Sequence, residues 1–208
     1  MDIKRMELVL MRHGSTLWNE QKRYLGHTDL SLTLQGREEM ISARRNLKGM
    51  SFCSVYCSDL ARCRESLHAV RPDLSAGATY DSALREMDFG DWEGHTYDQL
   101  KDVALYRQWL DDPQHITPPE GEAWVSFERR IVAFLEFMLN SAEREKKHKS
   151  ASPASVLLVA HGGVIRQIVS LLMPGKGFWD IRVEPGNLLI LTMEHRGESW
   201  AGVDLRMI

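Results

Sequence analysis

Hydrophobic residues in this chain gather in two short runs, each followed by a glycine-containing turn and then by a helical pattern. The runs extend from Glu7 to Arg12 and from Ser155 to Ala160. Continuous apolar runs of this length are typical of central strands that are covered on both faces. Residues Phe52 to Cys57 form a third candidate strand. The pattern therefore predicts a sheet that contains these segments.

Helical periodicity follows the candidate strands. Apolar residues recur three or four positions apart in three stretches: Met40, Ala43 and Leu47; Phe127, Ile131, Phe134, Leu135 and Met138; and Val164, Ile165, Ile168, Val169 and Leu172. Thr33 is placed to cap the first helix. Strands that alternate with such helices predict an α/β fold, a three-layer α/β/α sandwich with a largely parallel central sheet. Two late runs, Leu188 to Met193 and Trp200 to Leu205, predict a terminal hairpin.

The length of 208 residues favours one domain, 1–208, because the chain is long enough for one substantial core and shows no internal repeat. Residues 89–122 carry prolines and many aromatics, which predicts an insertion with short helices that flanks a site. The charged stretch 144–152 is interpreted as a solvated helix end and loop.

Composition excludes several classes of protein. Hydrophobic residues make up 43% of the chain, charged residues 26%, and the formal net charge is −3. These values are those of an ordinary globular protein and give no basic surplus for nucleic acid or anionic membrane. A phosphorylated small molecule needs only a local cluster of cations, so it stays available as a partner. A homodimer is compatible with the sequence, which does not fix the oligomeric state.

Three cysteines, Cys53, Cys57 and Cys63, lie within one short stretch. Their odd number argues against a secreted disulfide framework, and their spacing lacks the paired pattern of a zinc site. We interpret them as small buried apolar residues. No run approaches the about 18 apolar residues of a membrane span. We therefore expect a cytoplasmic protein without a metal or other cofactor.

Candidate chemistry lies where two of the predicted strands end. Arg12-His13-Gly14 follows the first run, and His161-Gly162-Gly163 follows the second. Ligands of open α/β sheets bind beyond the carboxyl ends of the strands, so neighbouring strands would bring both imidazoles into one crevice. A lone histidine is more often a buried structural residue. The paired positions favour a shared site.

Cations occur at the same predicted edge. Arg12 offers a fixed, permanently charged fork for phosphate oxygens, and Arg62 follows the third candidate strand. Phosphoryl transfer depends mainly on positioning and on stabilising negative charge, which two arginines and two histidines provide without a metal. Glu86 is a candidate proton donor, although its neighbours Asp88, Asp91 and Glu93 stay open as alternatives.

These residues belong to motifs that together resemble the histidine phosphatase superfamily, which includes the cofactor-dependent phosphoglycerate mutases. The motifs are Arg12-His13-Gly14-Ser15-Thr16-x-x-Asn19, Gly26-His27-Thr28-Asp29, Ser58-x-Leu60-x-Arg62, Leu84-x-Glu86-x-x-Phe89-Gly90-x-Trp92-Glu93-Gly94 and Ala160-His161-Gly162-Gly163. The resemblance implies that His13 becomes a phosphohistidine and that Arg12, Arg62 and His161 hold the phosphoryl group. It implies that Glu86 acts as acid and then as base, and that Asn19 adds a hydrogen bond. We also expect Gly14, Thr16, His27 and Gly162 to line the substrate site.

Two further stretches are similar to the α-ribazole phosphatases of cobalamin nucleotide-loop assembly. They are Gly121-Glu122-x-x-x-x-Phe127-x-Arg129-Arg130 and Trp179-x-x-Arg182-Val183-Glu184-x-Gly186. A broad-specificity phosphatase and a phosphoglycerate mutase are the alternatives within the superfamily. A non-catalytic module that binds a phosphorylated ligand is the alternative outside enzymes. Trp92, Trp109, Trp124 and Trp179 are either core residues or stacking partners for a substrate base.

Overall fold

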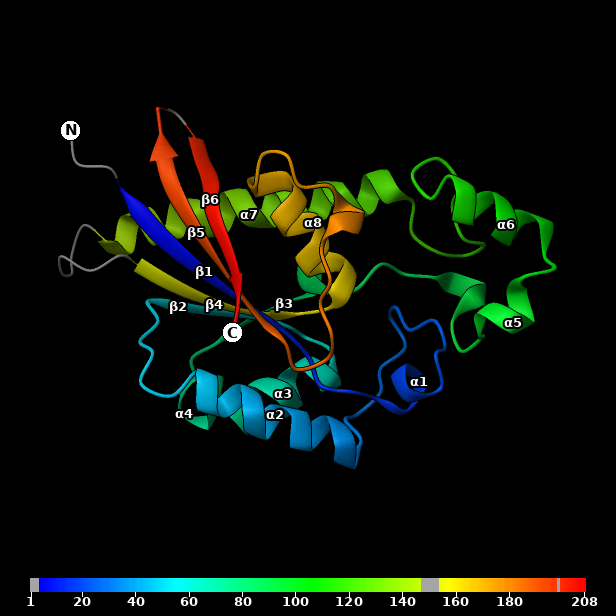
Figure 1. The fold of residues 1–208 in the computed structure, drawn as a ribbon, viewed down its shortest axis with the longest axis horizontal. Coiled ribbons are helices and arrows are strands. Elements are labelled where there is room, and N and C mark those ends of the chain that lie inside the picture. The colour runs from blue at the N-terminus through cyan, green and yellow to red at the C-terminus, as the bar shows by residue number, and fades with distance from the viewer. Residues whose placement is uncertain (1–3, 147–153, 198) are drawn as a thin grey trace.

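The computed structural model describes residues 4–146, 154–197 and 199–208 (Figure 1). In this part of the chain, six strands form one sheet in the order β3-β2-β4-β1-β5-β6. The strands are β1 (Arg5–Arg12), β2 (Ser54–Ser58), β3 (Thr79–Asp81), β4 (Ala154–Ala160), β5 (Leu188–Arg196) and β6 (Ser199–Met207). Strands β3, β2, β4 and β1 run parallel, while β5 is antiparallel to β1 and β6 to β5. The predicted sandwich with a largely parallel sheet is confirmed.

The register between β1 and β4 places the two candidate strand ends together. Arg12 pairs with Ala160 across the two parallel strands. The residues that follow, His13 and His161, therefore leave the same edge of the sheet side by side. The backbone N–H of His13 also donates to the carbonyl oxygen of Ala160 at 3.1 Å, which extends the pairing by one step beyond the strand.

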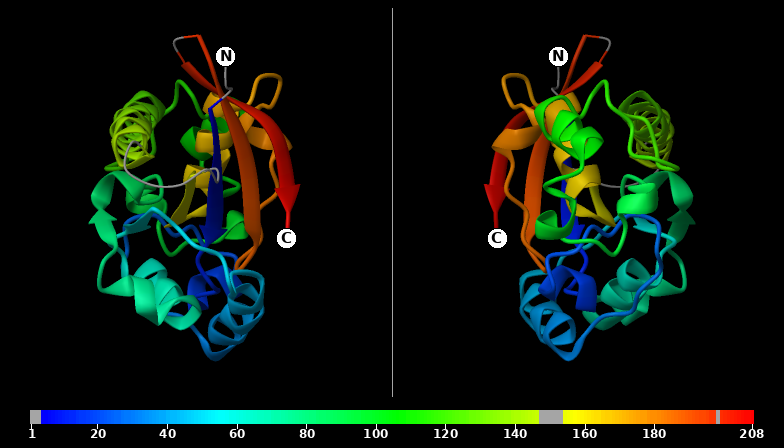
Figure 2. Two further views of the ribbon diagram at one scale, coloured as in Figure 1. Left: turned by 90° about the vertical axis from the view of Figure 1, so that its left-hand side faces the viewer. Right: turned by 90° about the vertical axis from the view of Figure 1, so that its right-hand side faces the viewer.

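Helices cover both faces of this sheet (Figures 1 and 2). α2 (Leu34–Asn46), α3 (Ala61–Val70) and α4 (Pro72–Ser75) lie on one side, and α7 (Trp124–Lys146) and α8 (Gly162–Leu172) lie on the other. The central strands are apolar on both faces because alternate residues enter different cores. In β1, Leu8 and Leu10 pack in the core with α7 and α8, whereas Val9 packs in the core with α2 and α3. A two-sided core explains the unbroken apolar runs of the sequence.

The segment between β3 and α7 extends beyond the carboxyl edge of the sheet (Figure 1). It contains η1 (Ser82–Leu84), η2 (Gly90–Trp92), α5 (Tyr97–Leu100) and α6 (Ala104–Asp111). A small aromatic cluster of its own, with Trp92, Tyr106 and Trp109, holds it together. The remaining short elements are α1 (Leu17–Glu20), after β1, and η3 (Phe178–Asp180), after α8.

Local predictions succeeded for most elements and failed for one cysteine. Thr33 caps α2 by accepting a hydrogen bond from the N–H of Gly36 at 3.1 Å, and the terminal hairpin forms. Cys57 and Cys63 are buried, but Cys53 is exposed, so its interpretation as a buried residue was wrong. The reason is that β2 begins at Ser54, one residue after Cys53. In the charged stretch, α7 extends to Lys146, and residues 147–152 lie outside the described part of the chain.

Candidate active site

The imidazoles of His13 and His161 meet at the end of β1 and β4. Their ring centroids lie 5.0 Å apart, with one ring edge facing the other. Both side chains are buried, with 3% and 1% of their surface exposed. The structure thus brings together two histidines that lie almost 150 positions apart in the sequence (161 against 13).

His13 is held as a neutral imidazole with one defined proton position. Its Nδ1 lies 2.7 Å from the carbonyl oxygen of Gly14. A carbonyl oxygen can only accept, so Nδ1 carries the proton and Nε2 keeps its lone pair. Burial, and then the positive charges of Arg62 and Arg12, lower the pKa of His13 well below its usual value of 6.5, against a smaller opposing effect of Gly14. At neutral pH, Nε2 of His13 is therefore available as a nucleophile.

Arg62, in the first turn of α3, is fully buried and fixed by three acceptors. Its two terminal nitrogens donate to the carbonyl oxygens of Thr28 (2.9 Å) and Gly26 (2.6 Å). Its Nε donates to Nδ1 of His161 at 3.2 Å. Burial lowers the pKa of Arg62, but a guanidinium stays protonated under all ordinary conditions. The site therefore contains a permanent positive charge in a rigid setting.

The contacts of His161 define its tautomer as well. Because Nδ1 accepts from Arg62, the proton is on Nε2, which donates to the hydroxyl of Ser58 at 2.9 Å. Burial, followed by the charge of Arg62, lowers the pKa of His161 well below 6.5. Both ring nitrogens are thus engaged by protein groups. His161 can contact a phosphoryl group only by exchanging one of these partners.

Arg12 approaches the site from the last position of β1. One terminal nitrogen donates to the carbonyl oxygen of Val183 at 2.6 Å, while Nε is buried and makes no hydrogen bond with any described residue. The guanidinium packs against the start of α8, where a Cβ on Gly162 would lie 3.5 Å from its central carbon. Burial lowers the pKa of Arg12, and the side chain remains charged. The buried Nε–H of Arg12 is therefore a donor that the described residues leave without an acceptor.

Glu86 reaches the first turn of α8 from the loop after η1. Its Oε2 accepts from the backbone N–H of Gly163 at 2.9 Å, and its Oε1 accepts from the N–H of Met87 at 3.1 Å. A Cβ on Gly163 would lie 2.3 Å from Oε1, so a side chain at this position would displace the carboxylate. The carboxylate is therefore bonded to Gly163, which follows His161 by two positions. It lies close enough for its charge to act on Arg12 and Arg62.

Comparison with known proteins shows the family of the chain. The model of the histidine phosphatase superfamily (branch 1) matches residues 8–205. The chain belongs to the histidine phosphatase superfamily. It is 33% identical over 185 residues to the adenosylcobalamin/alpha-ribazole phosphatase of Escherichia coli K12, covering 87% of each chain, and 31% identical to the same-named protein of Salmonella typhimurium, with the same coverage. The crystal structure of the alpha-ribazole phosphatase from Shigella flexneri superposes with a TM-score of 0.79 at 30% identity, covering 96% of each chain.

One of the remaining predicted site residues of this histidine phosphatase, Thr16, supports another, Asn19. Thr16 is buried and caps α1, and its N–H and hydroxyl both donate to Oδ1 of Asn19, at 3.1 and 2.9 Å. The amide nitrogen of Asn19 is the group that stays available for a phosphate oxygen. Thr16 therefore positions Asn19. Packing explains the glycine at position 14, because a Cβ on Gly14 would lie 2.4 Å from the carbonyl oxygen of Gly36 in α2.

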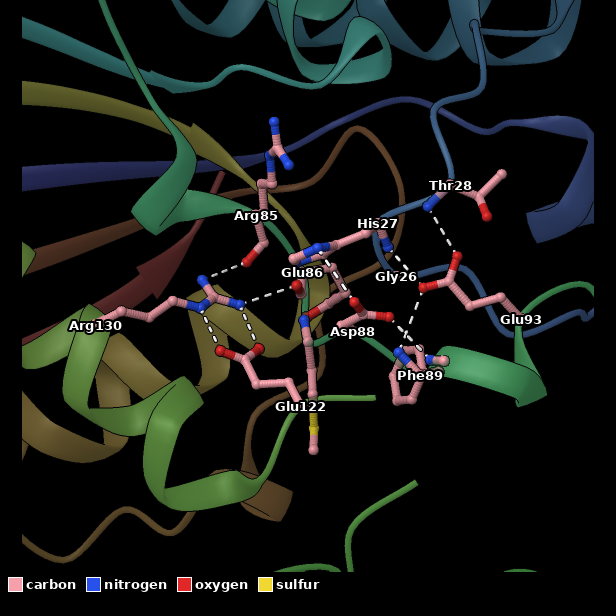
Figure 3. A network of polar contacts seen from close by, with 12 residues as sticks. Gly26, His27, Thr28, Arg85, Glu86, Asp88, Phe89, Glu93, Glu122 and Arg130 are labelled. Carbon is pink, nitrogen blue, oxygen red and sulfur yellow. Dashed lines mark hydrogen bonds and ion pairs between the residues drawn. The ribbon is translucent and has the colours of Figure 1, made fainter. Parts of the chain in front are cut away.

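His27 lies at the border of the site of the phosphatase. Its Nδ1 is 3.4 Å from Oδ2 of Asp88, and its side chain is 34% exposed. Its Nε2 is buried and has no hydrogen-bond partner among the described residues. The backbone N–H groups of His27 and Thr28 donate to the carboxylate of Glu93 at 2.7 and 2.8 Å (Figure 3). Glu93 thereby fixes the loop whose carbonyl groups hold Arg62.

A second carboxylate and an arginine fix the loop that carries Glu86 (Figure 3). Arg130 of α7 forms a two-pronged ion pair with Glu122, at 2.8 and 2.9 Å. The same guanidinium donates to the carbonyl oxygens of Ala83, Arg85 and Glu86, at 2.7 to 2.9 Å. The backbone on either side of the acid is thus tied to α7.

Sequence reasoning missed the supporting roles of Glu93 and Arg130, although both residues lie within the motifs that carry the family resemblance. Arg130 was part of a stretch used only for the family resemblance, and Glu93 was considered only as an alternative acid. One signal was present, since Arg130 follows Phe127 at helical spacing on the apolar face of α7, where a charged side chain needs buried acceptors. Within residues 4–146, 154–197 and 199–208, no three His, Cys, Asp or Glu side chains group as metal ligands. No helix in this part is long and apolar enough to cross a membrane.

Proposed function

We propose that this protein hydrolyses α-ribazole 5′-phosphate and that the phosphoryl group passes through His13. The observation that supports the chemistry is the state of His13, a neutral imidazole with a free lone pair on Nε2 beside the buried guanidinium of Arg62 and the partly buried one of Arg12. The substrate is supported by the names of relatives that are 31–33% identical over most of both chains. Membership of the superfamily supports the phosphatase reaction itself.

In the first step, Nε2 of His13 attacks the phosphorus and the ester P–O bond breaks. The proton of Glu86 passes to the leaving oxygen, which departs as the alcohol. Arg12 and Arg62 balance the charge spread over the equatorial oxygens, with the amide of Asn19 as a further donor. The free Nε donor of Arg12 suits this task, since it has no partner within the described structure.

In the second step, water attacks the phosphohistidine. The carboxylate of Glu86 takes a proton from this water, the P–N bond breaks, and inorganic phosphate leaves with His13 restored. Splitting the transfer into two steps lowers each barrier, and general acid–base help of this kind commonly contributes about 100- to 10,000-fold. The hydrogen bonds from Gly163 and Met87 place the carboxylate for both tasks.

Turnover and trapping by the pure protein test this proposal. We expect α-ribazole 5′-phosphate to give a higher kcat/KM than phosphoglycerates or simple sugar phosphates, and ³²P-labelled substrate to leave an acid-labile label on the enzyme. Equal rates on all esters would contradict the proposed substrate and indicate a broad-specificity phosphatase. Interconversion of phosphoglycerates would indicate a mutase. Phosphate binding without turnover would indicate the non-catalytic module.

The cytoplasmic location, the homodimer and the single domain with its insertion at 89–122 stay predictions. Cell fractionation and light scattering on the purified protein are the measurements that test the first two. Limited proteolysis tests the third, because one domain should lose its folded core in a single step.

A further inference from the structure

An aromatic cavity adjoins the acid and is not used by the phosphoryl chemistry. It has a volume of about 280 Å³ and is lined at one end by Glu86 and Gly163. Its other walls come from the insertion, from the first turns of α7 and from the segment after α8. Figure 1 shows the start of α7 lying between α8 and the insertion. The cavity therefore begins at the group that would protonate the leaving oxygen.

Two sets of rings face this space. Tyr24, Phe89 and Trp109 form the insertion side, where the Tyr24 ring meets those of Phe89 and Trp109 edge to face at 5.1 and 5.8 Å. These rings are fixed by one another and by the cluster around Trp109. A wall built of rigid rings favours a flat aromatic ligand over a flexible polar one.

A second group of rings that line the cavity consists of Trp124, Phe178 and Trp179. Phe178 meets the rings of Trp124 and Trp179 edge to face, with centroids 4.9 and 4.7 Å apart. Arg166 lies over the rings of Phe178 and Trp179 at 5.8 and 6.0 Å, and its Nε donates to the carbonyl oxygen of Ile181 at 3.0 Å. Of the described residues that line the cavity, Arg166 and Glu86 are the charged ones.

The dimensions and the chemistry limit what can occupy the cavity. Pockets for small ligands commonly measure about 300–1,000 Å³, so a cavity of about 280 Å³ has room for one small ring system. A polar leaving group such as glycerate would lose its water among the rings there, with Arg166 and Glu86 as the charged groups that could contact it. A flat heteroaromatic ring would gain stacking contacts and place its attached sugar toward Glu86.

We propose that this cavity is the leaving-group subsite and that it binds the flat heteroaromatic base of a phosphorylated riboside. This inference rests on the proposed function for the reaction, and adds to it the residues that select the substrate. Trp179 and Leu110 are the residues to change, because both line the cavity and both are exposed, at 65% and 43%, so that substitution spares the core.

The test compares two substrates that differ only in the base. The measured quantity is kcat/KM for α-ribazole 5′-phosphate divided by kcat/KM for ribose 5-phosphate. Trp179→Ala removes one of the rings that line the cavity and should lower this ratio about tenfold, a usual size for the loss of one stacking partner. Leu110→Trp places a ring in the cavity and should lower the ratio by about tenfold or more. The loss should fall mainly on α-ribazole 5′-phosphate, because ribose 5-phosphate carries no base that could occupy the cavity.

Matched controls come from the same kinds of position outside the cavity. Phe137→Ala removes an aromatic ring that is 54% exposed on α7, and Leu105→Trp adds one at a residue of α6 that is 38% exposed. Neither residue lines the cavity, so both variants should keep the wild-type ratio. A ratio that survives both cavity changes, or that falls equally in the controls, overturns the assignment.

Failure of the proposed function gives a different result. If the wild-type enzyme rejects α-ribazole 5′-phosphate but turns over other esters through His13, the proposed substrate is wrong. The cavity is then tested with p-nitrophenyl phosphate against glycerol phosphate. Trp179→Ala and Leu110→Trp should still reduce the preference for the aromatic ester, and an unchanged preference would overturn the subsite.

Discussion

The missing side chain of Gly163 makes room for the carboxylate of Glu86. A Cβ at this position would lie 2.3 Å from Oε1 of Glu86, and ordinary contact begins at 3.4 Å. The carboxylate of a Gly163→Ala variant must therefore retreat by about 1 Å. A displacement of about 1 Å at a reacting group can cost about 100-fold in rate, or about 2.7 kcal/mol in the barrier. We expect kcat/KM for an alkyl phosphate ester to fall by this factor.

Stability should not account for that loss. Alanine is favoured over glycine within helices by up to about 1 kcal/mol, and Gly163 lies in the first turn of α8. The free energy of unfolding measured in urea should therefore be unchanged or higher. Gly77→Ala is the control, because a Cβ on Gly77 meets nothing closer than the carbonyl oxygen of Leu74 at 4.0 Å.

Comparing esters with different leaving groups shows whether the Gly163→Ala variant has lost acid catalysis or has lost activity in general. p-Nitrophenolate leaves without a proton, whereas an alkoxide needs one. Loss of acid catalysis therefore lowers mainly the rate of hydrolysis of the alkyl ester. For Gly163→Ala, kcat/KM for p-nitrophenyl phosphate should fall less than about fivefold. Equal losses on the two esters would refute the view that Gly163 acts through Glu86.

Three further outcomes are expected. His13→Ala should abolish turnover and the ³²P label, and substantial residual activity in a steady-state assay would contradict the nucleophile. Arg130→Gln should leave Glu86 chemically intact but loosen its loop, lowering kcat for alkyl esters about tenfold with little change in KM, whereas a rise in KM alone would indicate a binding role. Burial lowers the pKa of His13 and His161, so the unfolded state binds more protons below about pH 6.5. The free energy of unfolding measured in urea should be highest above that pH and should fall as the pH is lowered, by at most about 1.4 kcal/mol per pH unit for each histidine. An unfolding free energy that stays constant between pH 7 and 5 would contradict this expectation.

Local pattern was sufficient for the central strands and for the position of the candidate residues at their ends. Residues 8–11 before His13 and 156–160 before His161 are apolar at consecutive positions because β1 and β4 are covered on both faces, and the sequence alone shows this pattern. The glycines and arginines beside them carry the resemblance to the superfamily. Cys53 shows the limit of such reasoning, because its burial depends on whether a strand begins one residue earlier or later.

Pairing between distant segments was decided only by the tertiary structure. The order of the sheet makes β4 the neighbour of β1, and the register of Arg12 with Ala160 sets the distance between the imidazoles. Nothing in the periodicity around Glu86 shows that it reaches the first turn of α8, or that Arg130 holds its loop from α7. The sequence by itself determined which groups are candidates for the chemistry, since each lies in a motif that carries the family resemblance. Packing determined their partners, because hydrogen bonds between segments so far apart along the chain depend on how whole layers fit together.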